Sequence, residues 1–328
     1  MAFSNTYDTT NPGSGVGNRE DLLDSLTILA PEETPVLSFA PKGKASATYT
    51  EWVVDDLSSV VTTGVAEGAD VTSFTDSFSG RARLGNYIQK FRRDFMVSDL
   101  QDAVDSVGPA KIAQAEAKAI REIKRDIEAT ICSTNDRTVE DGAGTVYGLR
   151  GLGDWIDSAG PSDVPAAYRT PAASIHASGA FTEDIMNTII SSMFVVTGYT
   201  NGLTLVADVE LRKLISKEFT RTVGDTNAVY RNVTFNGEDA MIKQSVEMYQ
   251  SDHGYVSLVN ANPDCMPDTT NRDYGYFLNT EYYSINELIP MGSTRLPNLG
   301  GGERGYVDAA LTLCLKHPGA FGKVTVIA

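Results

Sequence analysis

The chain has 328 residues, of which 27 are lysine or arginine and 43 are aspartate or glutamate, so its formal net charge is −16 at pH 7. A chain this acidic repels phosphate backbones, which disfavours direct nucleic-acid binding as its main function. Hydrophobic residues make up 41% and charged residues 21%, which is a globular composition with enough apolar material for a sizeable core.

No targeting or membrane segment is evident. Residues 1–4 lack the basic and apolar regions of a signal peptide, and no apolar run approaches about 18 residues. The three cysteines are too few and too scattered for a disulfide framework. We therefore expect synthesis in a reducing cytoplasm, no membrane association, and no role as a secreted binding module.

Residues with catalytic or ligand-binding potential are sparse. Cys314 and His317 form one Cys-x-x-His pair, which alone is a weak zinc signal, and the glycine clusters lack phosphate-binding spacing. We expect no catalytic, cofactor-binding or metal-binding residue. The enzymatic alternative is a hydrolase that uses carboxylates such as Asp55 and Asp56. Adjacent residues of a strand point to opposite faces, however, so this pair could not share a substrate.

The first third of the chain predicts extended parts rather than a packed domain. Residues 1–20 are polar and indicate a flexible arm, 21–29 have helical spacing up to Pro31, and 34–37 predict an extended segment. Strand-like runs at 49–54 and 84–95 flank a polar stretch at 58–79. This pattern predicts a long projecting hairpin that is stable only against a neighbour.

Residues 109–133 predict a long helix. Its surface is expected to carry the ion pairs Lys118–Glu122 and Lys124–Glu128 at i,i+4 spacing. Its narrow apolar stripe predicts a spine that backs onto a sheet or another subunit. The expected core residues of this helix are Ile112, Ile120, Ile123, Ile127 and Ile131.

The remainder predicts an α/β region and a returning strand. After an irregular stretch at 151–179 we expect a helix from Thr182 to Gly198, a strand at 203–206, a helix from Asp208, and strands at 229–235, from 241 onward and at 255–259. Alternating apolar residues predict a strand at 307–315 and a second at 323–326, lying beside the long helix.

A local basic run stands out against the acidic background. We interpret it as pairing with an acidic strip on a neighbouring subunit, the alternative being a solvated strand face. Its residues are Arg81, Arg83, Lys90, Arg92 and Arg93.

Five segments between residues 21 and 133 carry a family resemblance. They are LAPEETPV at 29–36 with the spacing P-x-x-T-P, EWVVDDL at 51–57, NYIQ at 86–89, the stretch 97–108, and EIKRDIE at 122–128. In this order they resemble major capsid proteins of tailed bacteriophages, in the branch that lacks a long N-terminal scaffolding domain. The second half is similar only in layout and in its ending, ALTL at 310–313 followed by His317-Pro318. Lys90 departs from the family, which more often has an aliphatic residue there.

The resemblance implies the α+β HK97-like capsid fold. Residues 1–44 would be an N-arm, 45–95 an extended E-loop, 96–150 with 300–328 an elongated P-domain, and 151–299 an α/β A-domain. Trp52 and Asp55 join the basic run as candidate subunit-interface residues.

The implied function is that of a major capsid protein. Its subunits would form hexamers and pentamers of an icosahedral shell around double-stranded DNA in the virion, after assembly in the host cytoplasm. Scaffolding, portal and decoration proteins would be its partners, with no cofactor.

Some capsids of this fold join an E-loop lysine to a neighbour's asparagine. No lysine lies between Lys44 and Lys90 here, and arginine is a poor nucleophile. We therefore expect a shell held together without covalent cross-links.

Overall fold

The computed structural model describes residues 31, 33–74, 76, 80–104, 111–198, 202–219, 232–236, 239–243 and 246–325. The expected flexible arm at 1–20, the helix at 21–29 and the proposed first turn at Pro109 lie outside these residues. No helix in the described part is long and apolar enough to cross a membrane.

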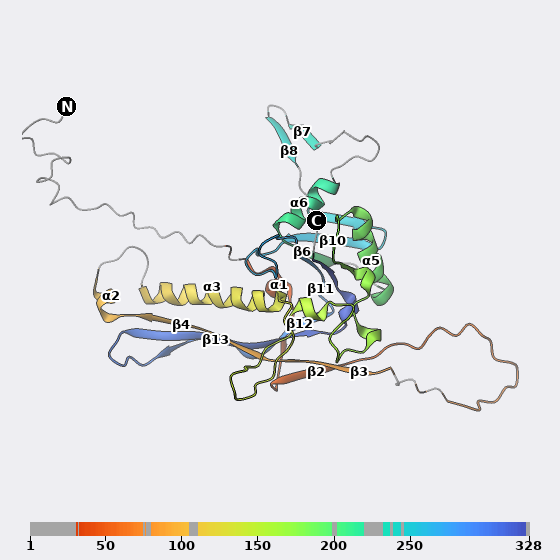
Figure 1. Cartoon of the computed structure of the whole chain (residues 1–328), viewed down its shortest axis with the longest axis horizontal. Helices are drawn as coiled ribbons and strands as arrows, with labels where there is room; N and C mark the ends of the chain where they lie inside the picture. Colours follow the sequence, from red (N-terminus) through yellow and green to blue (C-terminus); the bar gives the residue numbers. More distant parts are fainter. Residues whose placement is uncertain are drawn as a thin grey trace, which may run out of the picture.

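A long helix over a four-stranded sheet forms the elongated body of the molecule (Figure 1). Helix α3 spans Lys111–Cys132 and lies along strands β4 (Gln89–Val97) and β13 (Glu303–Leu315). The sheet order is β1-β12-β13-β4, with β1 at Lys42–Lys44 and β12 at Tyr283–Leu296. A short helix, α2 (Asp99–Ala103), follows β4 and is capped by Ser98, whose Oγ accepts the N–H of Gln101.

The pairing of β12 with β13 is antiparallel and irregular in the middle. The register shifts between Glu287 and Ile289 and again between Ile289 and Gly292. Pro290 lies within the second shift and has no N–H to donate to the ladder, which explains that irregularity.

A two-stranded hairpin crosses the end of this body and carries a long loop. Strand β2 (Tyr49–Val54) pairs antiparallel with β3 (Ala82–Tyr87). The connection at 55–81 is here called the projecting loop, and its described residues, 55–74, 76 and 80–81, extend away from the body (Figure 1). The sequence predicts a hairpin here from runs at 49–54 and 84–95, but only the second run's part up to Tyr87 pairs with β2, since β4 pairs with β13 instead.

The α/β region is built on a six-stranded sheet in the order β5-β14-β11-β6-β10-β9. Strands β6 and β10 are parallel, whereas β11 is antiparallel to both β6 and β14. The strands are β5 (Ile175–His176), β6 (Leu203–Ala207), β9 (Met248–Ser251), β10 (Gly254–Asn260), β11 (Gly275–Asn279) and β14 (Gly322–Val324).

Two helices pack on this sheet, as predicted. They are α5 (Glu183–Thr197), which ends at Gly198 in the left-handed conformation, and α6 (Val209–Phe219), which Asp208 precedes. A separate pair, β7 (Asn232–Asn236) and β8 (Asp239–Lys243), follows α6. Short helical turns occur at α4 (Leu152–Trp155), η2 (Ala166–Tyr168), η3 (Ala172–Ser174) and η4 (Pro318–Ala320).

Side chains along β6 alternate between two hydrophobic clusters, one on each face of the six-stranded sheet. Leu203, Leu205 and Ala207 face the cluster formed with α5 and α6, whereas Val206 joins the main cluster around α3. Because successive strand residues point to opposite faces, β6 joins the α/β region to the elongated body.

Strand pairing joins segments that the expected domain division separates. Strand β4, inside the expected extended loop at 45–95, pairs with β13, and β12, inside the expected segment 151–299, belongs to the same sheet. In contrast, β14 does not lie beside α3 but pairs with β11 in the six-stranded sheet. The turn at His317-Pro318-Gly319 ends β13 and redirects the chain there.

Two local expectations are wrong. Residues 34–37 are not extended, because Pro35–Phe39 form the short helix α1 with proline in its first turn. Glu128 does not pair with Lys124 at the surface, because its side chain is buried and accepts backbone N–H groups of α1.

Candidate assembly surfaces

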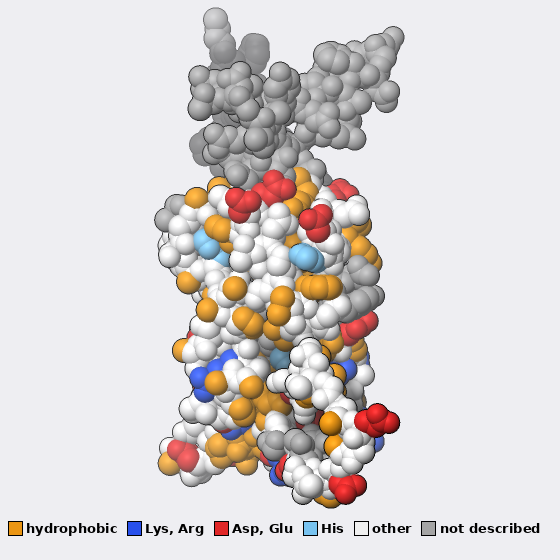
Figure 2. Space-filling view, turned by 90° about the vertical axis from the view of Figure 1, so that its right-hand side faces the viewer, with side chains coloured by type: hydrophobic (Ala, Val, Ile, Leu, Met, Phe, Trp, Pro, Cys, Tyr) orange, Lys and Arg blue, Asp and Glu red, His pale blue; other side chains and the backbone are white. Residues whose placement is uncertain are grey.

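The projecting loop carries large apolar side chains that contact no core of this chain. They are 73% to 93% exposed. Side chains of this kind are stabilised by burial, so their exposure in a row indicates a surface that another molecule covers. Hydrophobic and basic side chains gather in the lower half of the face from which this loop projects (Figure 2). The loop residues are Leu57, Val60, Val61, Val65, Val71 and Phe74.

Asn86 fixes the base of the hairpin to the body. Its Nδ2 donates to the carbonyl oxygens of Arg150 and Leu313 at 3.2 and 2.9 Å, and its Oδ1 accepts the N–H of Arg150 at 2.8 Å. The Oε1 of Gln89 accepts the N–H of Leu149 at 3.1 Å. The two amides of the N-x-x-Q segment therefore hold one stretch of backbone at 149–150, which is a physical reason for that spacing.

A buried arginine organises the polar contacts behind the hairpin. The Arg150 guanidinium is 1% exposed and forms ion pairs with Asp136 at 2.6 Å, Asp163 at 2.8 Å and Asp154 at 3.0 Å. It also lies over the Trp155 ring at 4.7 Å. Burial opposes ionisation of Asp163, but the hydrogen bonds and charge of Arg150 outweigh it and hold the pKa of Asp163 below its usual value.

A second arginine links this cluster to the hairpin. Arg137 Nη1 donates to the hydroxyl oxygen of Tyr49 at 2.6 Å and to the carbonyl oxygen of Gly85 at 2.8 Å, and its Nη2 pairs with Asp163 at 3.2 Å. Sequence reasoning missed both arginines. The one available signal was the position of Arg150 in the otherwise apolar and glycine-rich run GLRGLG.

The residues before β1 are held against α3 through their backbone. Glu128 Oε1 accepts the N–H of Val36 at 2.9 Å and its Oε2 accepts the N–H of Leu37 at 2.8 Å. Tyr283 donates its hydroxyl to the carbonyl oxygen of Val36 at 3.3 Å, and Asn262 Nδ2 donates to that of Glu33 at 2.9 Å. We call residues 31–39 the latch segment.

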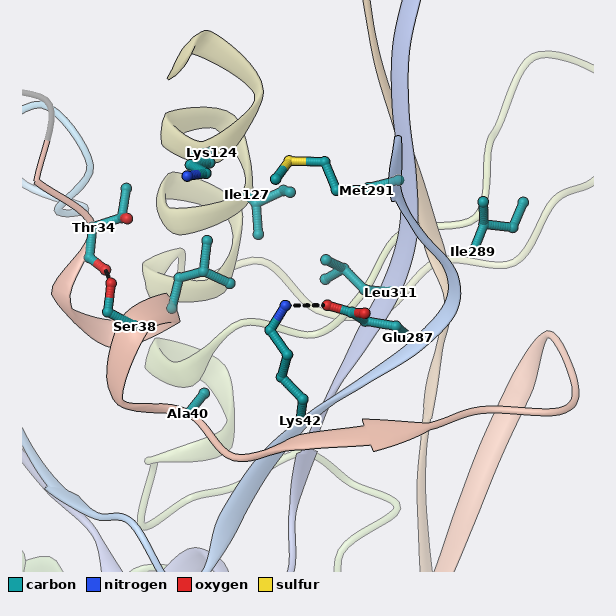
Figure 3. Close-up of a pocket in the computed structure, with 12 residues that line it drawn as sticks. Thr34, Ser38, Ala40, Lys42, Lys124, Ile127, Glu287, Ile289, Met291 and Leu311 are labelled. Atoms are coloured by element: carbon teal, nitrogen blue, oxygen red, sulfur yellow. Dashed lines mark hydrogen bonds and ion pairs between the residues drawn. The ribbon is translucent and has the colours of Figure 1, made fainter. Parts of the chain in front are cut away.

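An open cavity of about 270 Å³ lies between the latch segment, α3 and β12 (Figure 3). Met291 and Ile127 point toward one another across it, and Lys42 pairs with Glu287 at 2.9 Å on its wall. The cavity is mainly apolar with charged groups at its margin. It holds no cluster of ionisable groups with the arrangement of a catalytic site.

Each residue of the basic run has a carboxylate partner within its own chain. The pairs are Arg81–Asp55 at 2.6 Å, Arg83–Glu51 at 3.5 Å, Lys90–Asp308 at 3.3 Å, Arg92–Asp94 at 3.0 Å and Arg93–Asp126 at 2.6 Å. The Arg93 pair is bidentate and joins β4 to α3. A carboxylate of a neighbouring subunit would therefore have to join these ion pairs as an additional partner or displace the intrachain carboxylate.

The carboxylates of the enzymatic alternative lie beyond the strand that was expected to hold them. Strand β2 ends at Val54, and Asp55 binds Arg81, which lowers its pKa. The backbone N–H of Asp56 donates to Asp55 Oδ1 at 3.1 Å. Across the described ranges, no group of three or more His, Cys, Asp or Glu side chains is placed to hold a metal ion.

Trp52 and the helix isoleucines pack inside the chain. Trp52 is half-buried and its ring lies 5.7 Å from that of Trp155. Ile123, Ile127 and Ile131 are at most 2% exposed, and Ile112 and Ile120 are partly buried against the same cluster. Structure therefore places all five isoleucines on the core side of α3.

Comparison with known proteins agrees with this geometry. The family model of the SU10 major capsid protein matches residues 3–328, almost the whole chain. The chain belongs to the SU10 major capsid protein family. It is therefore a structural subunit of a capsid shell, and its place is in a phage virion. No curated protein matches it by sequence.

Solved capsids share the fold of this family member at low sequence identity. The capsid of the native GTA particle aligns with a TM-score of 0.64 and 13% identity over 98% of this chain and 99% of its own. The capsid of cyanophage P-SCSP1u aligns with a TM-score of 0.61 and 11% identity over 99% of both chains. A chain of Mycobacterium phage Bobi aligns with a TM-score of 0.60 and 14% identity over 97% of this chain and 99% of its own. The fold is accordingly the α+β HK97-like capsid fold.

Proposed function

We propose that the chain assembles into hexamers and pentamers of an icosahedral shell that encloses double-stranded DNA. The observation that carries the proposal is the projecting loop, whose apolar side chains at 57–74 have no core of their own chain to pack on. The capsid of the native GTA particle, which shares the fold, has been computed with C5 symmetry, which supports fivefold capsomers.

The charge balance is compatible with an inner wall that contacts DNA weakly. A net charge of −16 disfavours tight phosphate binding, so packaged DNA would be confined rather than bound at a specific site. We propose a purely structural role without catalysis, assembly in the host cytoplasm, and scaffolding, portal and decoration proteins as partners.

We propose that each region of the subunit has a different role in assembly. Residues 1–44 act as an N-terminal arm and the loop carried by β2 and β3 lies on a neighbouring subunit. The elongated body around α3 forms the wall, and the α/β region surrounds the capsomer axes. Interface candidates remain Trp52, Asp55, Arg81, Arg83, Lys90, Arg92 and Arg93.

Expression of the full chain followed by electron microscopy and sedimentation tests this function. We expect capsomers or closed shells with fivefold and sixfold positions. A small discrete oligomer that never enlarges, alone or with co-expressed phage assembly proteins, would contradict the proposal. Nuclease protection of DNA inside virions that contain the chain tests the DNA cargo separately.

A further inference from the structure

Glu128 lies in the core and has no cationic partner in the described part of the chain. Its side chain is 1% exposed, and it accepts hydrogen bonds from the backbone N–H groups of Val36 and Leu37. A buried carboxylate with two N–H donors and no counter-charge is partly stabilised by those bonds and strongly destabilised by the loss of water.

The thiol and phenol groups around Glu128, on α3 itself and on the elements packed against it, are neutral near pH 7. They are Cys132 on α3, Cys265 in the turn after β10 and Tyr283 on β12, and in each of them burial raises the pKa and the charge of Glu128 raises it further. Helix α1 contributes no ionisable side chain, since its sequence is PVLSF.

The two lysines that line the adjacent cavity, Lys42 and Lys124, do not form an ion pair with Glu128. Lys124 is exposed on α3, one turn before Glu128, and Lys42 on β1 pairs with Glu287 instead. Release of the latch segment is therefore a direct way for the buried carboxylate to regain water.

The latch segment is short enough to open by itself. Helix α1 has five residues, of which Pro35 and Val36 are buried and Leu37 is partly buried against the main core, whereas Phe39 is 42% exposed. Asn262 and Tyr283 also hold this segment through its backbone atoms. The cavity beside Leu37 and Ile127 already opens to the surface next to this contact.

We propose that the proton on Glu128 controls how firmly residues 31–39 are held on α3, and that the latch segment loosens as the solution becomes alkaline. The latch segment begins directly after residue 30, so its state sets whether residues 1–30 are attached to a fixed point on the body. This device concerns one chain and does not depend on the proposed shell geometry.

The direction of the effect follows from proton linkage. Burial, opposed by the bonds from Val36 and Leu37, raises the pKa of Glu128 to about 7, above its ordinary value of 4.5. The docked state therefore binds the proton more tightly than the open state. Docking is fully favoured below about pH 4.5 and weakens as the pH rises through about 7. Between about pH 5.5 and 8.5 these values correspond to a roughly 30-fold rise in the opening constant.

Hydrogen exchange on the full chain tests the proposal. The amides of Val36 and Leu37 are followed between pH 5.5 and 8.5, with each rate divided by the intrinsic rate at that pH. We expect their protection in the wild type to fall about 30-fold with rising pH, while amides in the middle of α3 stay protected. In Glu128→Gln the pH dependence should disappear. Glu122→Gln, the same change at a partly exposed position of the same helix, should behave as the wild type.

Constant protection in the wild type, tighter holding at alkaline pH, or pH dependence that persists in Glu128→Gln would each overturn the proposal. If Glu128→Gln fails to fold, infrared difference spectroscopy of the wild type provides a second measurement. It should detect one protonated carboxyl group that titrates near neutral pH together with the loss of protection at Val36. Titration of all carboxyl groups below about pH 5.5 would refute the latch.

Discussion

Asn86 and the backbone of Arg150 form a reciprocal pair in which the side-chain amide both donates to the carbonyl oxygen and accepts the N–H of the same residue. Asn86 is completely buried, and its second donor bond reaches the carbonyl oxygen of Leu313 in β13. One side chain thus joins the hairpin, the 149–150 stretch and the long sheet. The orientation of the projecting loop depends on this junction.

Replacement of Asn86 by leucine should destabilise the subunit. The change leaves the N–H of Arg150 and the carbonyl oxygen of Leu313 unpaired in the core, and each such group costs about 1–3 kcal/mol. Urea denaturation measures the loss. Asn135→Leu, at an exposed position, is the matched control and should change stability by no more than about 0.5 kcal/mol. Equal stability of the two variants would show that Asn86 is dispensable.

Arg150→Met should lower stability at neutral pH by about 1–3 kcal/mol, because Asp136 and Asp154 lose their guanidinium partner and Asp163 keeps only Arg137. In the wild type the pKa of Asp163 is depressed, so its stabilising effect is present above the unfolded pKa and is lost as the pH falls through the folded value. The variant lacks this effect, and protonation of its neighbouring aspartates relieves their mutual repulsion in the folded state. The difference between variant and wild type should therefore stay the same from pH 7 to pH 5 and shrink as the pH falls below about 4, as measured by calorimetric melts. A difference that persists at its neutral value down to about pH 3 would contradict the charge argument.

Ile123→Asp tests the spine helix. Ile123 is fully buried on the core side of α3. A carboxylate at this position would lack a partner and lower the free energy of unfolding by several kcal/mol. We expect insoluble protein or a markedly lower melting temperature. Lys124→Asp, one residue along on the exposed side, should express normally. Soluble Ile123→Asp with a wild-type melt would show that this face of α3 is not core.

Deletion of residues 58–80 should abolish shells without unfolding the subunit. The deletion joins Leu57 to Arg81 and keeps the Asp55–Arg81 ion pair and the β2–β3 ladder. The removed apolar side chains that the structure describes, from Val60 to Phe74, are exposed, so the melting temperature should change little. Electron microscopy and sedimentation report assembly. Normal particles from this variant would mean that the loop is not an assembly element.

Purified particles should release single subunits without residual cross-links. Lys44 lies in β1 and Lys90 in β4, both within the sheet of the body and away from the projecting loop, and all three cysteines are buried and free. A boiled, reduced denaturing gel should show one band near 35.3 kDa. A ladder of dimers and higher multiples would refute this expectation.

The local periodicity of apolar residues predicted the main helices and strands. Alternation at 307–315 predicted β13, the spacing of Ile123, Ile127 and Ile131 predicted the buried side of α3, and two strand-like runs around a polar stretch predicted the projecting hairpin. These features follow from local periodicity, since the side of a helix or strand that an apolar residue occupies depends on its sequence spacing.

The tertiary structure alone decided where the charged side chains lie. Lys124–Glu128 has the spacing of a surface pair, yet Glu128 is buried because the backbone of residues 36–37, more than 90 positions away, supplies its hydrogen bonds. The basic run looked free for a neighbour, yet each member meets a carboxylate of its own chain, such as Arg93 with Asp126. Ion pairs and buried polar groups depend on long-range approach, which has no period in the sequence. For the same reason β14 joined the sheet of β11, and the sequence could predict that strand but not its partner.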